Sequence, residues 1–297
     1  EPAAAAARGV REPMTGSGGS RAPFGARLRS VVADRGNLCV GIDPHPALLE
    51  AWGLEVSPAG LARFSRLALD AFGDLVPAIK PQVAFFEEHG SAGIAVLEDV
   101  LSSIGELGAL SIADAKRGDI GSTMAGYARA WLADGSPLAC DALTVSPYLG
   151  VGALDAAFDA ASDSGRGLFV LARTSNPEAG ELQTSTGERG TVAQTVIDEI
   201  GRRNTEAFGR GGGSFGVVVG ATVSDPPRLD GLSGPVLMPG GGEQRRTLAD
   251  VRRIAGPALP DTLVNISRHV LRAGPDVGEM RAVVSALTTQ YRFADTT

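Results

Sequence analysis

The most constraining feature of this sequence is a repeated alternation of short apolar runs with helix-like segments, which begins near residue 24. Each run is almost continuously apolar, which is typical of a parallel strand buried on both faces. Eight such runs occur, at residues 38–42, 76–81, 109–114, 139–145, 167–172, 215–220, 235–239 and 262–267. Eight strand–helix repeats predict a single α/β barrel of the (β/α)8, or TIM-barrel, type.

A doubly wound open sheet is the main alternative for such a chain. That fold usually carries a glycine-rich phosphate-binding turn directly after its first strand. Here the first predicted strand runs into GIDPHP (41–46), which is not such a turn. The clearest helix-like segments cover residues 58–72, 87–105, 123–133, 190–203 and 245–256. Residues 221–233 leave room only for a brief or irregular helix.

The first 22 residues differ in composition from the rest of the chain. They comprise an alanine run followed by TGSGGS, and they lack the apolar core of a secretory signal peptide. We expect residues 1–22 to be mobile, with Met14 as the natural start and residues 1–13 as an addition to it. Residues 23–297 are expected to form one catalytic barrel domain.

Composition narrows the classes of function. The 34 acidic and 27 basic residues give a net charge of −7, which argues against a nucleic-acid partner. No stretch of 18 apolar residues exists, so no transmembrane helix and no membrane partner are predicted. Cys39 and Cys140 lie in apolar runs and are expected to be buried, reduced thiols of a cytoplasmic protein. The three scattered histidines lack metal-ligand spacing, and no cofactor fingerprint occurs, so neither a metal nor a cofactor is predicted.

The basic residues are distributed unevenly. Twenty-five are arginine, and only Lys80 and Lys116 are lysine. Arginine stays protonated in proteins, whereas a lysine can deliver a proton when its surroundings tune its pKa. The two lysines are therefore candidates for proton chemistry. Their chance retention in an arginine-rich chain is the alternative.

Polar residues follow most of the predicted strands. In a (β/α)8 barrel the active site forms at the carboxyl ends of the strands, so these side chains are expected to line one pocket. They are Asp43, Lys80, Asp114, Lys116, Asp119, Arg173, Thr174, Ser175, Asn176, residues 239–244, Ser267 and Arg268. Both lysines belong to this set, which favours a functional role over chance retention.

The run DAKRGD (114–119) surrounds a lysine with two acids. Alternate residues of an extended strand share a face, so Asp114 and Lys116 are expected to project together. Neighbouring carboxylates hold a lysine cationic. A cationic lysine against a substrate carbon can stabilise a carbanion and then protonate it. A salt-bridged surface turn is the alternative interpretation.

Two features after the last strands indicate phosphate binding. The glycine run that includes Gly240 and Gly242 could present backbone N–H groups, and Arg268 could form a bidentate contact. Phosphate sites after strands seven and eight recur in this fold. The loop at residues 174–190 is rich in Gly, Ser and Thr, which suits a mobile lid, with a plain surface loop as the alternative.

The segment ADAKRGDIGST (113–123) resembles the signature of the orotidine 5′-phosphate decarboxylase family. The resemblance extends through GIDPHP, IKPQVAFFE, LARTSNPEAGELQ, PGGGEQ and NISRHVL, and its middle segments look most like the bacterial branch common in actinobacteria. It implies a cofactor-free decarboxylation of orotidine 5′-phosphate to uridine 5′-phosphate, the last step of de novo pyrimidine synthesis.

The resemblance also implies roles for the charged residues. Lys80, Asp114 and Lys116 match an alternating charged array, in which Lys116 is the proton donor to C6 of the pyrimidine. Asp119 and Thr123 match residues that the partner subunit contributes. The resemblance therefore implies a homodimer with shared active sites.

Further matched positions would contact the substrate: Asp43 the ribose, Ser175 the pyrimidine edge, and Gln244 and Arg268 the phosphate. Two places depart from the family's pattern. His269 follows Arg268 where a small residue is usual, and Arg245 and Arg246 follow Gln244 where glycine is frequent. Both departures concern the phosphate site more than the chemistry.

Two other functions stay open at this stage. One is a Mg²⁺-dependent sugar-phosphate decarboxylase of the same barrel superfamily, whose members also carry Asp-x-Lys-x-x-Asp. Loss of activity in EDTA would favour it. The other is a non-catalytic protein that binds uridine monophosphate without turnover. The retained lysines argue against it, because an anion-binding protein could use arginine.

Overall fold

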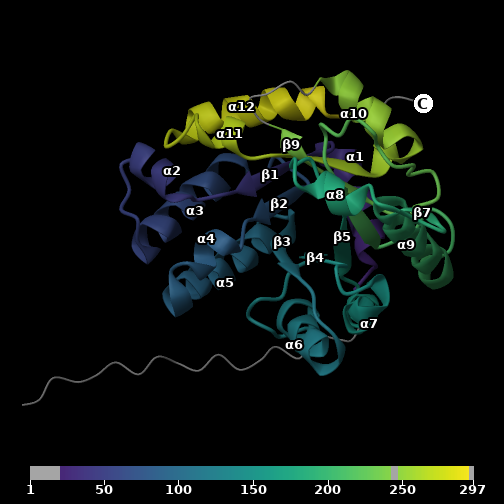
Figure 1. Ribbon diagram of the computed structural model, residues 1–297. Helices are drawn as coiled ribbons and strands as arrows, with labels where there is room; N and C mark the ends of the chain where they lie inside the picture. The colour runs from purple at the N-terminus through teal and green to yellow at the C-terminus, as the bar shows by residue number, and fades with distance from the viewer. Residues whose placement is uncertain (1–20, 242–246, 294–297) are drawn as a thin grey trace, which may run out of the picture.

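Eight parallel strands close into a barrel with helices packed around it (Figure 1). The protein is seen here as a computed structural model that describes residues 21–241 and 247–293. In barrel order the strands are β1 (Leu38–Ile42), β2 (Ala78–Pro81), β3 (Leu110–Arg117), β4 (Ala142–Val145), β5 (Gly167–Arg173), β8 (Phe215–Val219), β9 (Val236–Gly241) and β10 (Thr262–Ile266). Each predicted apolar run overlaps one of them, so the (β/α)8 prediction is confirmed and the open-sheet alternative is wrong.

Some predictions fall outside the described residues. They concern residues 1–20, including the start at Met14, and the segment that holds Gly242, Gln244, Arg245 and Arg246. The mobility of the first residues and the phosphate roles of Gly242 and Gln244 therefore stay predictions.

Helices connect most of the strands. They are α1 (Phe24–Arg35), α2 (Pro46–Ala51), α3 (Pro58–Phe72), α4 (Ala84–Glu87), α5 (Gly90–Glu106), α6 (Gly121–Leu132), α7 (Asp155–Asp163), α8 (Ala179–Gln183), α9 (Val192–Phe208), α10 (Leu248–Ala255), α11 (Arg268–Leu271) and α12 (Val277–Gln290). The five predicted helical segments overlap α3, α5, α6, α9 and α10. Residues 220–235 form no helix, whereas the sequence predicts a brief or irregular one at 221–233; two adjacent prolines in this short segment disfavour a helix. Within the described ranges, no helix is long and apolar enough to cross a membrane.

Several outer helices begin at caps that are visible in the sequence. The Ser57 hydroxyl accepts the backbone N–H of Gly60 at 3.2 Å, and Thr191 accepts that of Gln194 at 3.1 Å. At α10, Thr247 and Asp250 cap each other's backbone N–H groups. Such caps satisfy N–H groups that the first helical turn leaves without partners, so they fix where each helix starts.

The period-two alternation of the strands divides the core into two layers. One set of side chains packs outward against the helices, and the other fills the barrel interior. The interior set includes Cys39, Ala78, Ile112, Phe169, Val218, Leu237 and Leu263. Helix α1 covers the amino end, where the ring of Phe24 meets that of Phe169 edge-on at 5.9 Å. The interior is therefore apolar at its amino end, which leaves the carboxyl end for polar groups.

The long connection after β5 contains more structure than a plain loop. It holds α8 and a two-stranded hairpin of β6 (Thr186–Gly187) and β7 (Gly190–Thr191). The side chain of Gln183 accepts the N–H of Thr174 at 2.7 Å, which ties α8 to the end of β5. Turn and cap residues within the segment thus organise it locally. Movement as a lid stays a prediction.

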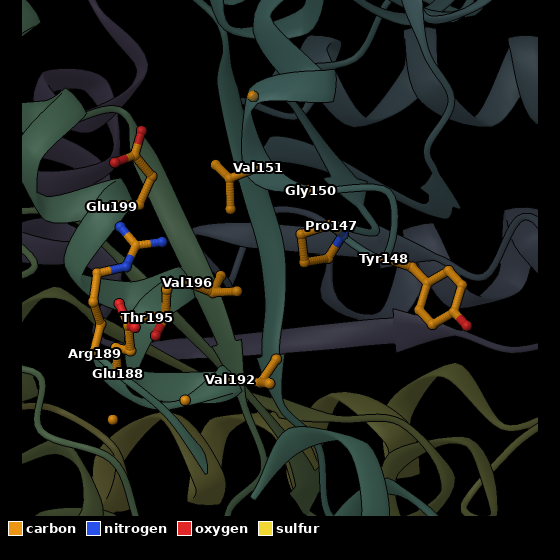
Figure 2. A pocket seen from close by; sticks show the side chains of 13 residues that line it. Pro147, Tyr148, Gly150, Val151, Glu188, Arg189, Val192, Thr195, Val196 and Glu199 are labelled. Carbon is orange, nitrogen blue, oxygen red and sulfur yellow. The ribbon is translucent and has the colours of Figure 1, made fainter. Parts of the chain in front are cut away.

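A cavity of about 610 Å³ opens between this hairpin, the start of α9 and the loop after β4. Figure 2 shows Pro147 and Val151 on one side of it and Thr195 and Val196 on the other, while the ring of Tyr148 extends away. Neither lysine of the chain lines this cavity.

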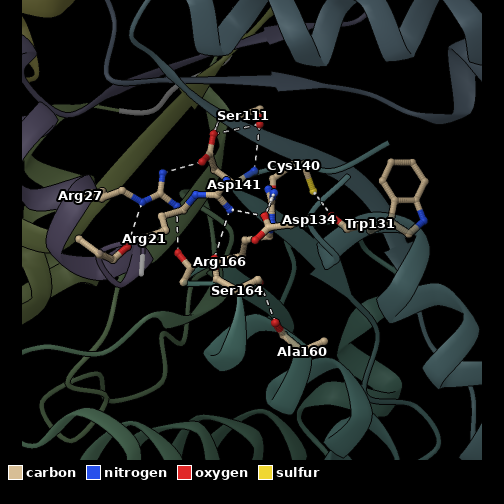
Figure 3. A network of polar contacts seen from close by, with 12 residues as sticks. Arg21, Arg27, Ser111, Trp131, Asp134, Cys140, Asp141, Ala160, Ser164 and Arg166 are labelled. Carbon is tan, nitrogen blue, oxygen red and sulfur yellow. Dashed lines mark hydrogen bonds and ion pairs between the residues drawn. The ribbon is translucent and has the colours of Figure 1, made fainter. Parts of the chain in front are cut away.

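Charged side chains fasten the amino end of the barrel (Figure 3). The guanidinium of Arg27 on α1 donates to one carboxylate oxygen of Asp141 at 2.5 Å. The other oxygen accepts the backbone N–H of Ser111 at 2.9 Å. Arg166 bonds the carbonyl of Cys140 at 2.5 Å and Asp134 at 2.9 Å. These bonds join α1, β3 and the segments before β4 and β5, so this end of the barrel serves stability.

Burial predicts that both cysteines are inert in the folded protein. Cys39 and Cys140 are fully buried, and burial raises the pKa of each thiol to about 12. Because the thiolate is the reactive form, neither residue should react with a disulfide reagent in native buffer, and both should react in denaturant. Stoichiometric labelling of the native protein within minutes would contradict this prediction.

Candidate active site

A pocket of about 310 Å³ lies at the carboxyl end of the barrel. Its lining brings together residues that are far apart in the sequence: Asp43, Lys80, Asp114, Lys116, Gly240 and Arg268. They come from the ends of β1, β2, β3, β9 and β10 or from the residues that follow. A barrel places these ends at one face, so the expected convergence is present for these six positions.

Alternation along the strands explains which side chains reach the pocket. On β3, Leu110 and Ile112 belong to the interior layer, and Asp114 follows them at the same spacing. On β2, Ala78 is interior and Lys80 follows it. The polar pair is therefore the next layer above the apolar barrel interior.

The carboxylate of Asp114 is shared between two lysines. Its Oδ2 accepts from Lys80 Nζ at 2.8 Å, and its Oδ1 accepts from Lys116 Nζ at 2.6 Å. Gln82 Nε2 also donates to Oδ2 at 3.0 Å. On the other side of Lys80, Asp43 Oδ1 lies 4.0 Å from Nζ. The predicted charged array is therefore assembled within one chain as far as Asp43, Lys80, Asp114 and Lys116.

In this array, the effect of neighbouring opposite charges on the pKa values of Lys80 and Asp114 is larger than the effect of burial. Burial alone would lower the pKa of Lys80, but the charges of Asp114 and Asp43 hold that pKa above its ordinary value. Burial alone would raise the pKa of Asp114, but Lys80 and Lys116 hold it well below its usual range. Lys80 and Asp114 therefore remain ionised at neutral pH.

The two lysines differ in exposure, and this difference separates their possible tasks. The side chain of Lys80 is 4% exposed, whereas that of Lys116 is 45% exposed at the mouth of the pocket. A bound molecule can therefore reach the ammonium of Lys116, while Lys80 stays beneath Asp114. Of the two, Lys116 is the group placed to act on a substrate atom.

Three features of the pocket suit an anionic, hydroxyl-bearing ligand. Asp43 Oδ1 is buried without a hydrogen-bond partner among the described residues, so a ligand hydroxyl could donate to it. Arg268 lines the pocket and forms no ion pair with residues in the described ranges. Gly240 has φ +112°, a conformation that favours glycine and brings backbone close to a ligand.

Five of the residues predicted for the site do not line the pocket. Arg173 lines a separate cavity, and the side chain of Asn176 bonds Thr174 and Glu178 instead. The other three are Asp119, Thr123 and Ser175. Asp119 accepts the backbone N–H of Ile120 at 2.7 Å, and Thr123 is exposed on the first turn of α6. Ser175 is exposed and sits against Gly220, and its neighbour Thr174 lines the pocket instead. The roles given to these three residues by the family resemblance stay predictions.

The pocket also contains residues that were not singled out from the sequence as binding residues. Gln82 and Asn265 add polar groups, and Leu171, Val218 and Leu237 form an apolar side. Gln82 lies two residues after Lys80, and Asn265 is the polar member of an apolar strand. Because side chains two residues apart on a strand point to the same face, the position of Gln82 two residues after Lys80 would have identified it. In the described ranges, no group of three or more potential metal-ligating side chains occurs.

Fold and pocket together define a class of protein. A (β/α)8 barrel with two lysines at the carboxyl ends of its strands and, at the same mouth, an arginine without an ion pair in the described ranges is a barrel enzyme for a small anionic substrate. The chain belongs to the "Orotidine 5′-phosphate decarboxylase / HUMPS family", whose profile matches residues 36–283.

Individual relatives agree with this assignment. An orotidine 5′-phosphate decarboxylase of Corynebacterium efficiens is 53% identical over 270 residues, which cover 90% of this chain and 96% of that protein. One from Streptomyces coelicolor is 51% identical and covers 92% and 99%. A crystal structure from Streptomyces avermitilis superposes with a TM-score of 0.89 at 49% identity, covering 94% and 98% of the two chains.

The buried ion pairs predict unequal effects of the two lysines on stability. Lys80→Met should lower the free energy of unfolding by about 3–5 kcal/mol at pH 7, because it leaves a buried carboxylate short of a partner. Lys116→Met, at an exposed site, should cost about 1 kcal/mol or less. Urea unfolding measures both variants, and equal losses would contradict the prediction.

The same pair predicts a pH dependence. Because the pKa of Asp114 is depressed in the folded protein, its ionisation contributes stability that is present above the unfolded pKa of about 3.9 and is lost as the pH falls below it. The stability difference between wild type and Lys80→Met should therefore shrink below about pH 4.

Proposed function

We propose that the chain decarboxylates orotidine 5′-phosphate to uridine 5′-phosphate, with Lys116 protonating C6. The protein is then a carboxy-lyase of pyrimidine biosynthesis, in agreement with its family and its curated relatives. The observation that carries the assignment of Lys116 is its half-exposed ammonium, held by the buried Asp114 at 2.6 Å. An exposed ammonium at the pocket mouth suits the protonation of a carbanion.

The proposed binding mode places the phosphate far from the reacting carbon. Arg268 and the backbone near Gly240 bind the phosphate, together with Gly242 and Gln244. Asp43 accepts a ribose hydroxyl, for which its partnerless Oδ1 is suited. Ser175 contacts the pyrimidine edge. Phosphate binding can then close the loop after β5 and align the charged array, so that remote binding energy is realised in the transition state.

In the proposed reaction, the bond from C6 to the carboxylate carbon breaks, and the electron pair stays on C6 as CO₂ leaves. The ammonium of Lys116 stabilises this negative charge and then transfers a proton to C6. The neutral amine regains its proton from water. Asp114 holds Lys116 in place and faces the departing carboxylate, while Lys80 keeps Asp114 ionised and positioned.

We propose further that the working enzyme is a homodimer with shared active sites. Asp119 and Thr123 of one subunit would complete the array of the other. In support, a second cavity of about 660 Å³ opens beside the array and is lined by Asp43, Lys116 and Arg268 on one chain. Ile120, next to Asp119, is 62% exposed, which suits burial against a second subunit.

The proposal also covers domain organisation and location. Residues 23–297 act as one catalytic domain. The protein works in the cytoplasm, which its two free, buried cysteines support.

The first experiment is an ultraviolet assay of purified protein with orotidine 5′-phosphate in EDTA. Conversion to uridine 5′-phosphate that survives EDTA is the expected result. Activity that is lost in EDTA would favour the metal-dependent sugar-phosphate decarboxylases. Binding of uridine 5′-phosphate without any conversion would favour the non-catalytic binding protein.

The chemistry of Lys116 predicts that a conservative change is as damaging as a drastic one. Lys116→Arg should nearly abolish turnover, as Lys116→Ala does, because a guanidinium is a poor acid. Arg129→Lys, an exposed substitution on α6, serves as the control and should keep wild-type activity. A kcat near the wild-type value in Lys116→Arg would rule out proton donation by Lys116.

Shared active sites predict complementation between inactive subunits. Lys116→Ala and Asp119→Ala homodimers should each be inactive, whereas a mixture should recover activity, because one site of each heterodimer contains both native residues. After random subunit exchange about half of the dimers are heterodimers, each with one intact site of two, so the recovered activity can reach about one quarter of the wild-type rate. Subunit exchange is verified by mass spectrometry, and no recovery despite exchange would contradict a shared site.

A further inference from the structure

The backbone that carries Lys116 departs from a regular strand. In the pairing of β3 with β4, Ala113 lies opposite Leu143, but Arg117 lies opposite Val145. Three residues of β3, from Asp114 to Lys116, thus face the single residue Thr144. Such a bulge redirects side chains at a strand end. Within it Lys116 has φ +48°, in the left-handed region that side-chain-bearing residues rarely adopt.

The hydroxyl of Thr144 binds both ends of this bulge. Thr144 Oγ1 accepts the backbone N–H of Lys116 at 2.9 Å. The same hydroxyl donates to Asp114 Oδ1 at 3.1 Å, whereas the carbonyl of Ala113 lies farther away at 3.5 Å. Thr144 is 1% exposed. Its single proton and lone pairs are therefore used within the array, and water does not compete for them.

We propose that Thr144 is a positioning residue for the decarboxylation. Thr144 does not line the pocket, so it acts through its neighbours. It holds the left-handed backbone of Lys116 and orients the carboxylate oxygen that binds Lys116 Nζ. The role in catalysis rests on the proposed function of Lys116 as the proton donor.

Removal of the hydroxyl should release this arrangement without changing the size of the side chain. In Thr144→Val the Lys116 N–H loses its acceptor, and Asp114 Oδ1 loses one donor. The left-handed conformation then has less to hold it, and the ammonium can move away from its place above the pocket. A displacement of about 1 Å can cost roughly 100-fold in rate.

The test compares Thr144→Val with Thr144→Ser and with a matched control. Thr262→Val removes another fully buried threonine hydroxyl, which donates to the carbonyl of Ala258 at 2.8 Å at the amino end of β10. We expect kcat to fall roughly 10- to 100-fold in Thr144→Val with KM changed less than about 3-fold. Thr144→Ser should recover kcat to within about 3-fold of wild type, and Thr262→Val should keep it.

A double variant asks whether Thr144 acts through Lys116. In the Lys116→Ala background, Thr144→Val should slow the residual single-turnover rate by less than about 3-fold, because the donor that it positions is already absent. Three results would each overturn the proposal. The first is a 10- to 100-fold loss from Thr144→Val in the Lys116→Ala background. The others are an unchanged kcat in Thr144→Val alone and a kcat in Thr144→Ser that stays as low as in Thr144→Val.

A crystal structure of Thr144→Val provides a readout that does not depend on activity. Lys116 should leave the left-handed region, or its Nζ should lie more than about 3.5 Å from Asp114. An unchanged Lys116 would overturn the positioning role. An inactive wild type would refute the proposed function instead, and the crystal structure would still decide whether Thr144 holds Lys116.

Discussion

The carboxylate of Asp114 is the interaction on which the rest of the site depends. It is buried and accepts hydrogen bonds from both lysines of the chain, from Gln82 and from Thr144. A buried charge is tolerated only when it is paired and hydrogen-bonded, and here the partners come from β3 itself and from its two neighbours, β2 with the residue that follows it and β4. The site is therefore stable only when β2, β3 and β4 are in their native register.

The barrel separates stability from chemistry along its axis. At the amino end, α1 closes the interior through Phe24, and Arg27 and Asp141 join the elements around it. At the carboxyl end, no helix covers the charged side chains in this way, and they face a pocket. Lys116 is half exposed there, and Arg268 forms no ion pair among the described residues. The rigid end holds the strands, and this lets the other end keep charged groups at fixed positions.

The proposed decarboxylation demands a large rate acceleration from a small number of charged groups. Enzymes lower barriers by roughly 8–23 kcal/mol, and one ammonium cannot supply the upper part of that range alone. The proposed division of work answers this demand: phosphate contacts supply binding energy, the array supplies preorganised charge, and a second subunit completes the site. The strained backbone at Lys116 fits the same picture, because strain is kept where surrounding bonds such as that from Thr144 hold it.

The sequence by itself determined the barrel, because continuous apolar runs and intervening amphipathic segments are local signals. It also marked Lys80 and Lys116, since lysine is rare in this chain and both follow strands. Only the tertiary structure decided which lysine is buried and which is exposed, because burial depends on strand closure. Asn265 and Thr144 could not be assigned from sequence, because their importance arises from neighbours 30 or more residues away. The bulge at Lys116 was likewise invisible, since it is a mismatch in register between two strands.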